Sequence, residues 1–116
     1  MKRLILITLY FVALTTPVVS AQEASIKALN FNIKKCFEQT ELGAKGSKRA
    51  CREVIWSNIA TRENKAIAYY NRAVINLNHQ DKKAALEDFE NAVKLSPDLT
   101  ASVSQATMLI ATNSQQ

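Results

Sequence analysis

Helical periodicity without any strand-like alternation is the feature that most constrains this chain. From Gln22 onward the only residues that favour chain breaks by their backbone are Gly43, Gly46 and Pro97. Apolar residues recur there at intervals of three and four, which is the spacing of an amphipathic α-helix. The short polar connections require successive helices to lie antiparallel. The sequence therefore predicts an all-α fold, built as a stack of antiparallel helical hairpins.

The positions of the helices follow from caps and breakers. Ser47 and Asp81 are predicted caps, because short polar side chains accept hydrogen bonds from the free amides of a helix start. The "GAKG" stretch is expected to end the first helix, and Pro97 to stop the fourth. The apolar stripes predict about five helices, over residues 25–42, 47–59, 62–78, 82–95 and from 99 onward. Ile59, Leu86 and Leu109 are expected to face inward.

Residues 1–21 have the pattern of a signal peptide. Lys2 and Arg3 precede an apolar stretch, residues 4–19, and small residues at Val19 and Ala21 suit cleavage after Ala21. The alternative is an uncleaved membrane anchor, but the stretch is shorter than the roughly 20 apolar residues that a spanning helix needs. We expect a periplasmic or secreted protein with no membrane attachment after cleavage. Loss of Lys2 and Arg3 lowers the formal net charge from +5 to +3.

Two cysteines, Cys36 and Cys51, remain in the exported part. An even number of cysteines in an oxidising compartment indicates a disulfide. In an antiparallel hairpin the two lie at similar heights, so a bridge is feasible. A redox pair usually needs closer thiols, as in Cys-X-X-Cys, and two cysteines with one histidine do not complete a zinc site. We predict a structural disulfide, with no metal and no cofactor.

The unit from Ala66 to Pro97 resembles a tetratricopeptide repeat, a helix–turn–helix of about 34 residues. Large and small residues alternate where its two helices would touch, which allows close approach. The glycine usual in the turn is missing from "NLNHQDKK". The residues that carry the resemblance are Tyr69, Ala73, Ala85, Phe89, Ala92 and Pro97.

The rest of the chain resembles the tetratricopeptide family more weakly. Residues 22–62 look like a degenerate first hairpin, residues 63–97 form the repeat, and residues 98–116 would be a capping helix and tail. The pattern "C…IWSN…AIAYYNRA" before the repeat resembles small exported tetratricopeptide proteins of bacteria. That resemblance implies a periplasmic or secreted, non-catalytic module that binds a protein or peptide.

In the family, the first helix of each repeat lines a concave binding face. Aliphatic residues, an aromatic ring and two amides there suit a peptide or helix laid in a groove. The alternative is that the first or the fifth helix covers these residues. The candidate binding residues are Ile67, Tyr70, Asn71, Val74, Leu77 and Asn78. A second hypothesis is a structural homo-oligomer, in which the incomplete solenoid stacks on another copy.

Other chemistry-bearing residues predict no catalytic site. His79 is expected in an exposed turn, and the acidic residues Glu87, Asp88 and Glu90 on a solvated face. Trp56 is expected in the core, with an exposed contact residue as the alternative. Basic residues look scattered rather than gathered on one stripe, so no nucleic-acid partner is expected. The sequence lacks a phosphate-binding loop and hydrolase motifs, and we expect no enzyme.

The signal-peptide interpretation makes one direct prediction. Intact-mass analysis of the protein recovered from an exporting host should give an N-terminus at Gln22, because cleavage follows Ala21. Replacing Ala21 by a bulky residue should block or move the cleavage. An N-terminus at Met1 in the wild-type protein would contradict the prediction.

Overall fold

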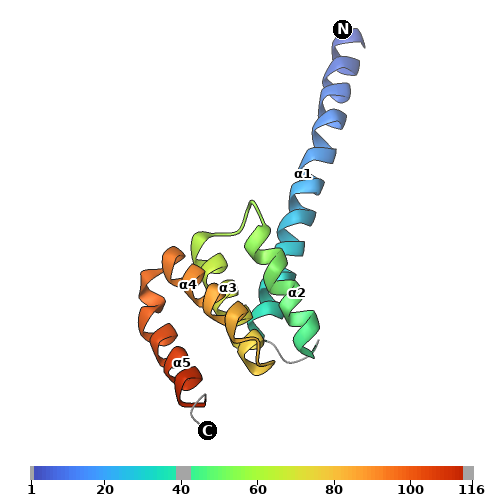
Figure 1. Cartoon of the computed structure of the whole chain (residues 1–116). Coiled ribbons are helices and arrows are strands. Elements are labelled where there is room, and N and C mark those ends of the chain that lie inside the picture. Colours follow the sequence, from blue (N-terminus) through green and yellow to red (C-terminus); the bar gives the residue numbers. More distant parts are fainter. Residues whose placement is uncertain (1, 39–42, 114–116) are drawn as a thin grey trace.

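The structure, a computed structural model, describes residues 2–38 and 43–113, with side chains described for residues 20–38 and 45–112. Its elements are α1 (Lys2–Glu38), α2 (Gly43–Trp56), α3 (Arg62–Asn78), α4 (Lys82–Leu95), the short 3-10 helix η1 (Pro97–Leu99) and α5 (Thr100–Asn113). All elements of the described part are helical, which confirms the predicted all-α fold (Figure 1). Side chains of the predicted signal peptide before Ser20 lie outside the described residues, as do residues 114–116 of the predicted tail.

Neighbouring helices pack in chain order. The most extensive packing joins α3 and α4, followed by α1 with α2 and α2 with α3, while α5 lies against α4. The N-terminal half of α1 projects away from the other helices (Figure 1). Within the described residues, no helix is both long enough and apolar enough to cross a membrane.

Side chains cap both helices of the α3–α4 hairpin, at Asp81 as the sequence predicts and also at Thr61. Thr61 Oγ1 accepts a hydrogen bond from the amide of Asn64 at 3.1 Å, and Asp81 Oδ1 accepts one from the amide of Ala84 at 3.2 Å. Gln80, in the turn between the helices, has a φ of 62°. This left-handed conformation favours glycine, so Gln80 occupies the kind of position for which the tetratricopeptide family usually has a glycine.

The far end of this hairpin is closed by an arginine. Arg62 Nε donates to the carbonyl oxygen of Leu95 at 2.8 Å, and Arg62 Nη2 donates to that of Lys94 at 3.3 Å. A cation at the end of α4 satisfies carbonyls that have no partner within the helix and complements the helix dipole. Pro97 then ends α4 and begins η1, as its missing amide hydrogen predicts.

Helix α3 lies between two hydrophobic clusters. Ala68 and Ile75 belong to a cluster shared with α1 and α2. Ala73, on the opposite face of the helix, belongs to a second cluster with Phe89 of α4 and Ile110 of α5. The buried alanines of α3 have no exposed surface, so neighbouring helices approach it closely. Since both clusters include residues of α3, the arrangement of the stack depends on this helix.

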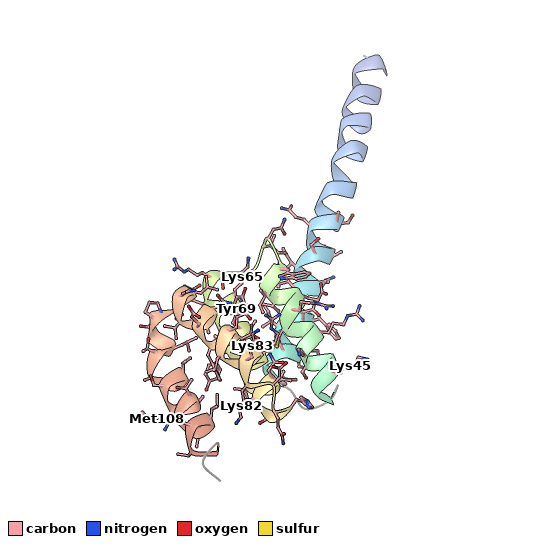
Figure 2. All side chains as sticks on the ribbon, in the orientation of Figure 1. Lys45, Lys65, Tyr69, Lys82, Lys83 and Met108 are labelled. Carbon is pink, nitrogen blue, oxygen red and sulfur yellow. A yellow bond between two sulfur atoms is a disulfide. The ribbon has the colours of Figure 1, made fainter. Side chains whose placement is uncertain are left out.

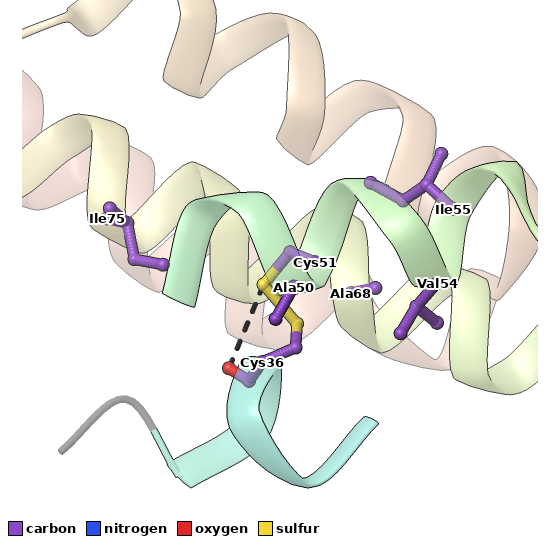
Figure 3. Packing of buried hydrophobic residues seen from close by; sticks show 7 residues of the cluster. All are labelled: Cys36, Ala50, Cys51, Val54, Ile55, Ala68 and Ile75. Atoms are coloured by element: carbon purple, nitrogen blue, oxygen red, sulfur yellow. Dashed lines mark hydrogen bonds between the residues drawn. A yellow bond between two sulfur atoms is a disulfide. The ribbon is translucent and has the colours of Figure 1, made fainter. Parts of the chain in front are cut away.

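The predicted disulfide between Cys36 and Cys51 is confirmed. It joins α1 to α2 within the first cluster, with a Cα–Cα distance of 4.7 Å and both residues fully buried (Figure 3). The Cys51 Sγ also lies 3.8 Å from the carbonyl oxygen of Cys36. A sulfur in a disulfide carries no hydrogen, so this approach is a packing contact. The bridge fixes α2 on α1 beside Ala50 and Val54.

Two predicted helix starts are wrong. Ser25 does not begin a helix, because its Oγ donates back to the carbonyl oxygen of Ala21 at 3.1 Å inside a continuous α1. Ser47 is not a cap either, since α2 already begins at Gly43 and Ser47 is buried within it. The "GAKG" stretch therefore forms the first turn of α2 instead of ending α1, whose last described residue is Glu38.

Many predicted inward residues are buried, but several are not. Ile55, Ala85 and Phe89 lie in the core as expected. Ile59, Leu86 and Leu109 are exposed, at 48%, 47% and 60% of their surface. Ile59 follows the end of α2 at Trp56 and so has left the helical stripe, whereas Leu86 and Leu109 each lie one position off the buried stripe of their helix.

The disulfide should contribute measurably to stability. A closed loop of this size restricts the unfolded chain and is worth about 3 kcal/mol. Reductant should therefore lower the free energy of unfolding in urea by about that amount, measured by circular dichroism. The Cys36→Ala/Cys51→Ala protein is the control, because reductant should leave its unfolding unchanged. Two alkylatable thiols in the wild-type protein without reductant would contradict the prediction.

Candidate functional site

Half of the predicted concave face is covered by α5. Tyr70, Val74 and Leu77 are partly buried and pack against the second cluster, as do Val103 and Ala106 of α5. The ring of Tyr70 lies 5.5 Å from that of Phe89, tilted by 59°. Coverage by the fifth helix, which the sequence left open as an alternative, therefore applies to these three residues.

The other three candidate residues are not part of that cluster. Ile67 and Asn71 are half-buried, and Asn78 is exposed at the last turn of α3. Their spacing places them along one face of α3, next to Val74. The six residues therefore do not form one open groove, because three of them are covered and only Asn78 of the other three is exposed.

Trp56, the only tryptophan of the sequence, is 76% exposed at the end of α2. Its prediction as a core residue is wrong. The buried stripe of α2 runs through Cys51, Val54 and Ile55, and Trp56 lies on the outer face, one turn after Arg52. The Arg52 guanidinium lies 5.9 Å from the centre of the indole ring, within the range of a cation–π contact.

A shallow groove of about 300 Å³ adjoins Trp56. Ala28 and Leu29 of α1 form one wall, and the other is formed by Trp56 and the connection that follows α2, including the exposed Ile59. The remaining lining residues are polar: Ser25, Asn32, Glu53, Ser57 and Asn58. The groove thus places two large exposed apolar side chains within a polar rim.

The outer face of α2 is strongly basic. Lys45, Lys48, Arg49 and Arg52 follow one another at intervals of three, one and three residues and so share one face of the helix. Together with Arg72 of α3 they line a cavity of about 380 Å³. The expectation of scattered basic residues is wrong here, although helical spacing alone could have revealed this stripe.

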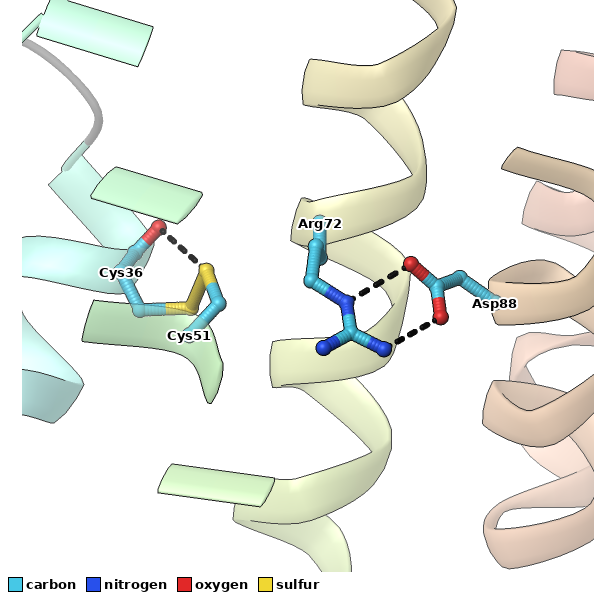
Figure 4. Close-up of a disulfide and its surroundings, with 4 residues drawn as sticks. All are labelled: Cys36, Cys51, Arg72 and Asp88. Carbon is cyan, nitrogen blue, oxygen red and sulfur yellow. Dashed lines mark hydrogen bonds and ion pairs between the residues drawn. A yellow bond between two sulfur atoms is a disulfide. The ribbon is translucent and has the colours of Figure 1, made fainter. Parts of the chain in front are cut away.

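Arg72 and Asp88 form a partly buried ion pair between α3 and α4 (Figure 4). Arg72 Nε donates to Asp88 Oδ2 at 2.8 Å, and Arg72 Nη2 donates to Oδ1 at 2.7 Å. Asn76 Nδ2 also donates to Oδ2, at 3.2 Å. The hydrogen bonds with Asp88 raise the pKa of Arg72 against the effect of its partial burial, so Arg72 remains a cation.

This pair corrects the interpretation of the acidic residues on α4. Glu87 and Glu90 lie on the solvated face as expected, but Asp88 is only 4% exposed. Asp88 precedes Phe89 and points to the polar side of α3, which the apolar pattern of α4 does not reveal. Both of its oxygens accept hydrogen bonds, which suits a structural ion pair between two helices.

His79 lies where the sequence placed it. It is exposed after the last turn of α3, and its amide donates to the carbonyl oxygens of Ile75 and Asn76, both at 3.2 Å. Within the described ranges, no three histidine, cysteine or acidic side chains come together in a way that could hold a metal ion.

Comparison with known proteins gives no relative. No family model, no curated protein and no solved structure matches the chain.

The ion pair generates a stability prediction with a matched control. Asp88→Ala leaves a partly buried guanidinium without its partner and should lower the free energy of unfolding by about 2 to 3 kcal/mol. Glu87→Ala, at the exposed neighbouring position, should change it by less than about 0.5 kcal/mol. Urea unfolding followed by circular dichroism measures both. If both substitutions changed the free energy of unfolding equally, the ion pair would not stabilise the packing of α3 on α4.

Proposed function

We propose that this chain is an exported, non-catalytic protein-interaction module of the tetratricopeptide type, and that it binds an apolar segment of another protein beside Trp56. The observation that carries the proposal is the exposure of Trp56 at the edge of a groove. Tryptophan is the residue type most enriched among the side chains that dominate binding energy at protein interfaces. An exposed tryptophan next to a second exposed apolar residue, Ile59, is costly to leave in water and marks a contact surface.

The chemistry of the groove favours a different protein over a second copy as the occupant. Permanent homodimer interfaces are extensively apolar, whereas reversible interfaces combine a small apolar centre with a polar rim. Here Trp56, Ile59 and Leu29 form the apolar centre, and five polar residues surround it. A partner segment that inserts one or two apolar side chains and hydrogen-bonds the rim fits this arrangement.

Three features support the assignment to the tetratricopeptide type. Ala73 and Ala85 are fully buried where α3 meets α4, and Phe89 fills the space beside them. The turn residue Gln80 adopts the backbone conformation for which a glycine is usual. Helix α5 packs against the apolar side chains of the hairpin, as a capping helix of a solenoid would.

Export is supported by the Cys36–Cys51 disulfide, because such bridges persist mainly in oxidising compartments. The apolar stretch at residues 4–19, with its basic start, supports the same conclusion. Periplasmic or secreted localisation is therefore part of the proposal, in line with the small exported bacterial proteins that the sequence resembles.

Self-association is a second candidate, and one observation favours it. Met108 and Leu109 are 66% and 60% exposed on α5, at the end of the helix stack. Figure 2 shows Met108 and Lys45 of α2 at opposite sides of the molecule. A further copy stacked on α5 would cover Met108 and leave the Trp56 groove free, so the two candidates use different surfaces.

Site-specific photo-crosslinking tests the proposal in an exporting host. A benzophenone amino acid is placed at position 56 in one protein and at position 108 in another. We expect position 56 to crosslink to another protein, and Ile59→Asp in the same chain to abolish that crosslink. The identified segment, added as a synthetic peptide, should shift the emission of Trp56 to shorter wavelength, because its insertion removes water from the indole.

Crosslinking at positions 56 and 108, together with a check of folding, separates partner binding from self-association. Circular dichroism should show that Ile59→Asp keeps the helices, since Ile59 is exposed outside α2. Crosslinks between copies at position 108, together with a mass that rises with concentration, would replace the proposal by self-association. A partner that crosslinks at position 56 regardless of Ile59→Asp, or whose peptide leaves the emission unchanged, would overturn the groove assignment.

A further inference from the structure

The cavity between α2 and α3 is lined by cations alone. Its five lining residues are Lys45, Lys48, Arg49 and Arg52 of α2 and Arg72 of α3. None of its residues lines the groove beside Trp56. Like charges in one small space repel each other, so an arrangement of this kind is stabilised when an anion enters it.

The charges of the cavity are only partly compensated by the protein. Arg72 pairs with Asp88, and Arg52 Nη2 lies 3.8 Å from the carboxylate of the exposed Glu53. Lys45, Lys48 and Arg49 make no ion pair within the described part of the chain. The cavity therefore holds about three positive charges that a ligand could neutralise.

Arg72 supplies a donor that is already fixed in place. Its Nε and Nη2 are bound by Asp88, and its guanidinium lies 5.5 Å from the centre of the Tyr69 ring. Figure 4 shows the remaining guanidinium nitrogen pointing away from Asp88. Since the side chain is held by two neighbours, a ligand that accepts a hydrogen bond from this nitrogen does not have to order it.

We propose that this cavity binds a compact anion that carries one or two phosphoryl groups. A phosphoryl group bears a charge of about −1.5 to −2 at neutral pH, so one or two of them match about three cations, whereas a carboxylate contributes only a single charge. Arginine and lysine are also the side chains that bind phosphoryl oxygens most often. The volume of about 380 Å³ lies at the lower end of the range for small-molecule sites.

The phosphoryl group could belong to a free small molecule or to a lipid headgroup, and two assays separate these sources. Isothermal titration calorimetry of the exported, disulfide-bonded protein uses inorganic pyrophosphate as the free probe. Flotation uses vesicles of phosphatidylcholine with or without phosphatidic acid. Saturable binding of pyrophosphate alone identifies a free ligand, and binding to phosphatidic-acid vesicles that pyrophosphate displaces identifies a headgroup.

A matched pair of double variants tests the cavity itself. Lys48→Gln/Arg49→Gln removes two exposed cavity cations that make no ion pair with any described residue, and should weaken binding at least about tenfold. Lys65→Gln/Lys94→Gln removes the same charge outside the cavity and should change binding by less than about twofold. Thermal unfolding of both proteins checks that the fold is retained.

Three results would overturn the proposal. The first is no binding to either probe. The second is an equal loss in both double variants, which would show attraction to net charge and not to the cavity. The third is equally tight binding of citrate, which would show that the cavity accepts any trivalent anion and has no preference for phosphoryl groups.

Discussion

The burial of α3 on two opposite faces is the constraint on which the rest of this structure depends. One face packs on α1 and α2 through Ala68 and Ile75, and the other packs on α4 and α5 through Ala73. Fully buried alanines allow the neighbouring backbones to come close on both sides, as dense packing requires. Because α3 contacts helices from both ends of the chain, a change in its position would move the disulfide-linked pair relative to α5.

A third side of α3 is polar and buried, and it links the fold to the basic cavity. Asp88 of α4 satisfies Arg72, and Asn76 satisfies the remaining capacity of that carboxylate. Without this pair, Arg72 would add an uncompensated charge beside Lys48 and Arg49 of α2. The ion pair therefore does two things: it joins α3 to α4, and it keeps an arginine in a cluster whose other members repel it.

The sequence predicted the parts of the fold that local chemistry determines. Asp81 was expected to cap α4 and Pro97 to stop it, and the structure agrees with both. The sequence did not give the start of α1 or of α2. Ser25 and Ser47 have the side chain of a helix cap, but both lie inside a helix, where that side chain does not cap a free amide. Trp56 and Asp88 were misplaced for a related reason: each lies one position from a buried residue, and a shift of one residue turns a helix by about 100°.

The two proposed binding surfaces meet at α2, and one residue connects them. The disulfide and the buried stripe fix the inner face of this helix, so the orientation of its outer face is fixed as well. Arg52 lines the basic cavity and also lies against the ring of Trp56. An anion that drew Arg52 away from the ring would remove a cation–π contact worth about 0.5 to 1 kcal/mol at an exposed site. Coupling through this contact between the cavity and the Trp56 groove is therefore limited to about fivefold in affinity.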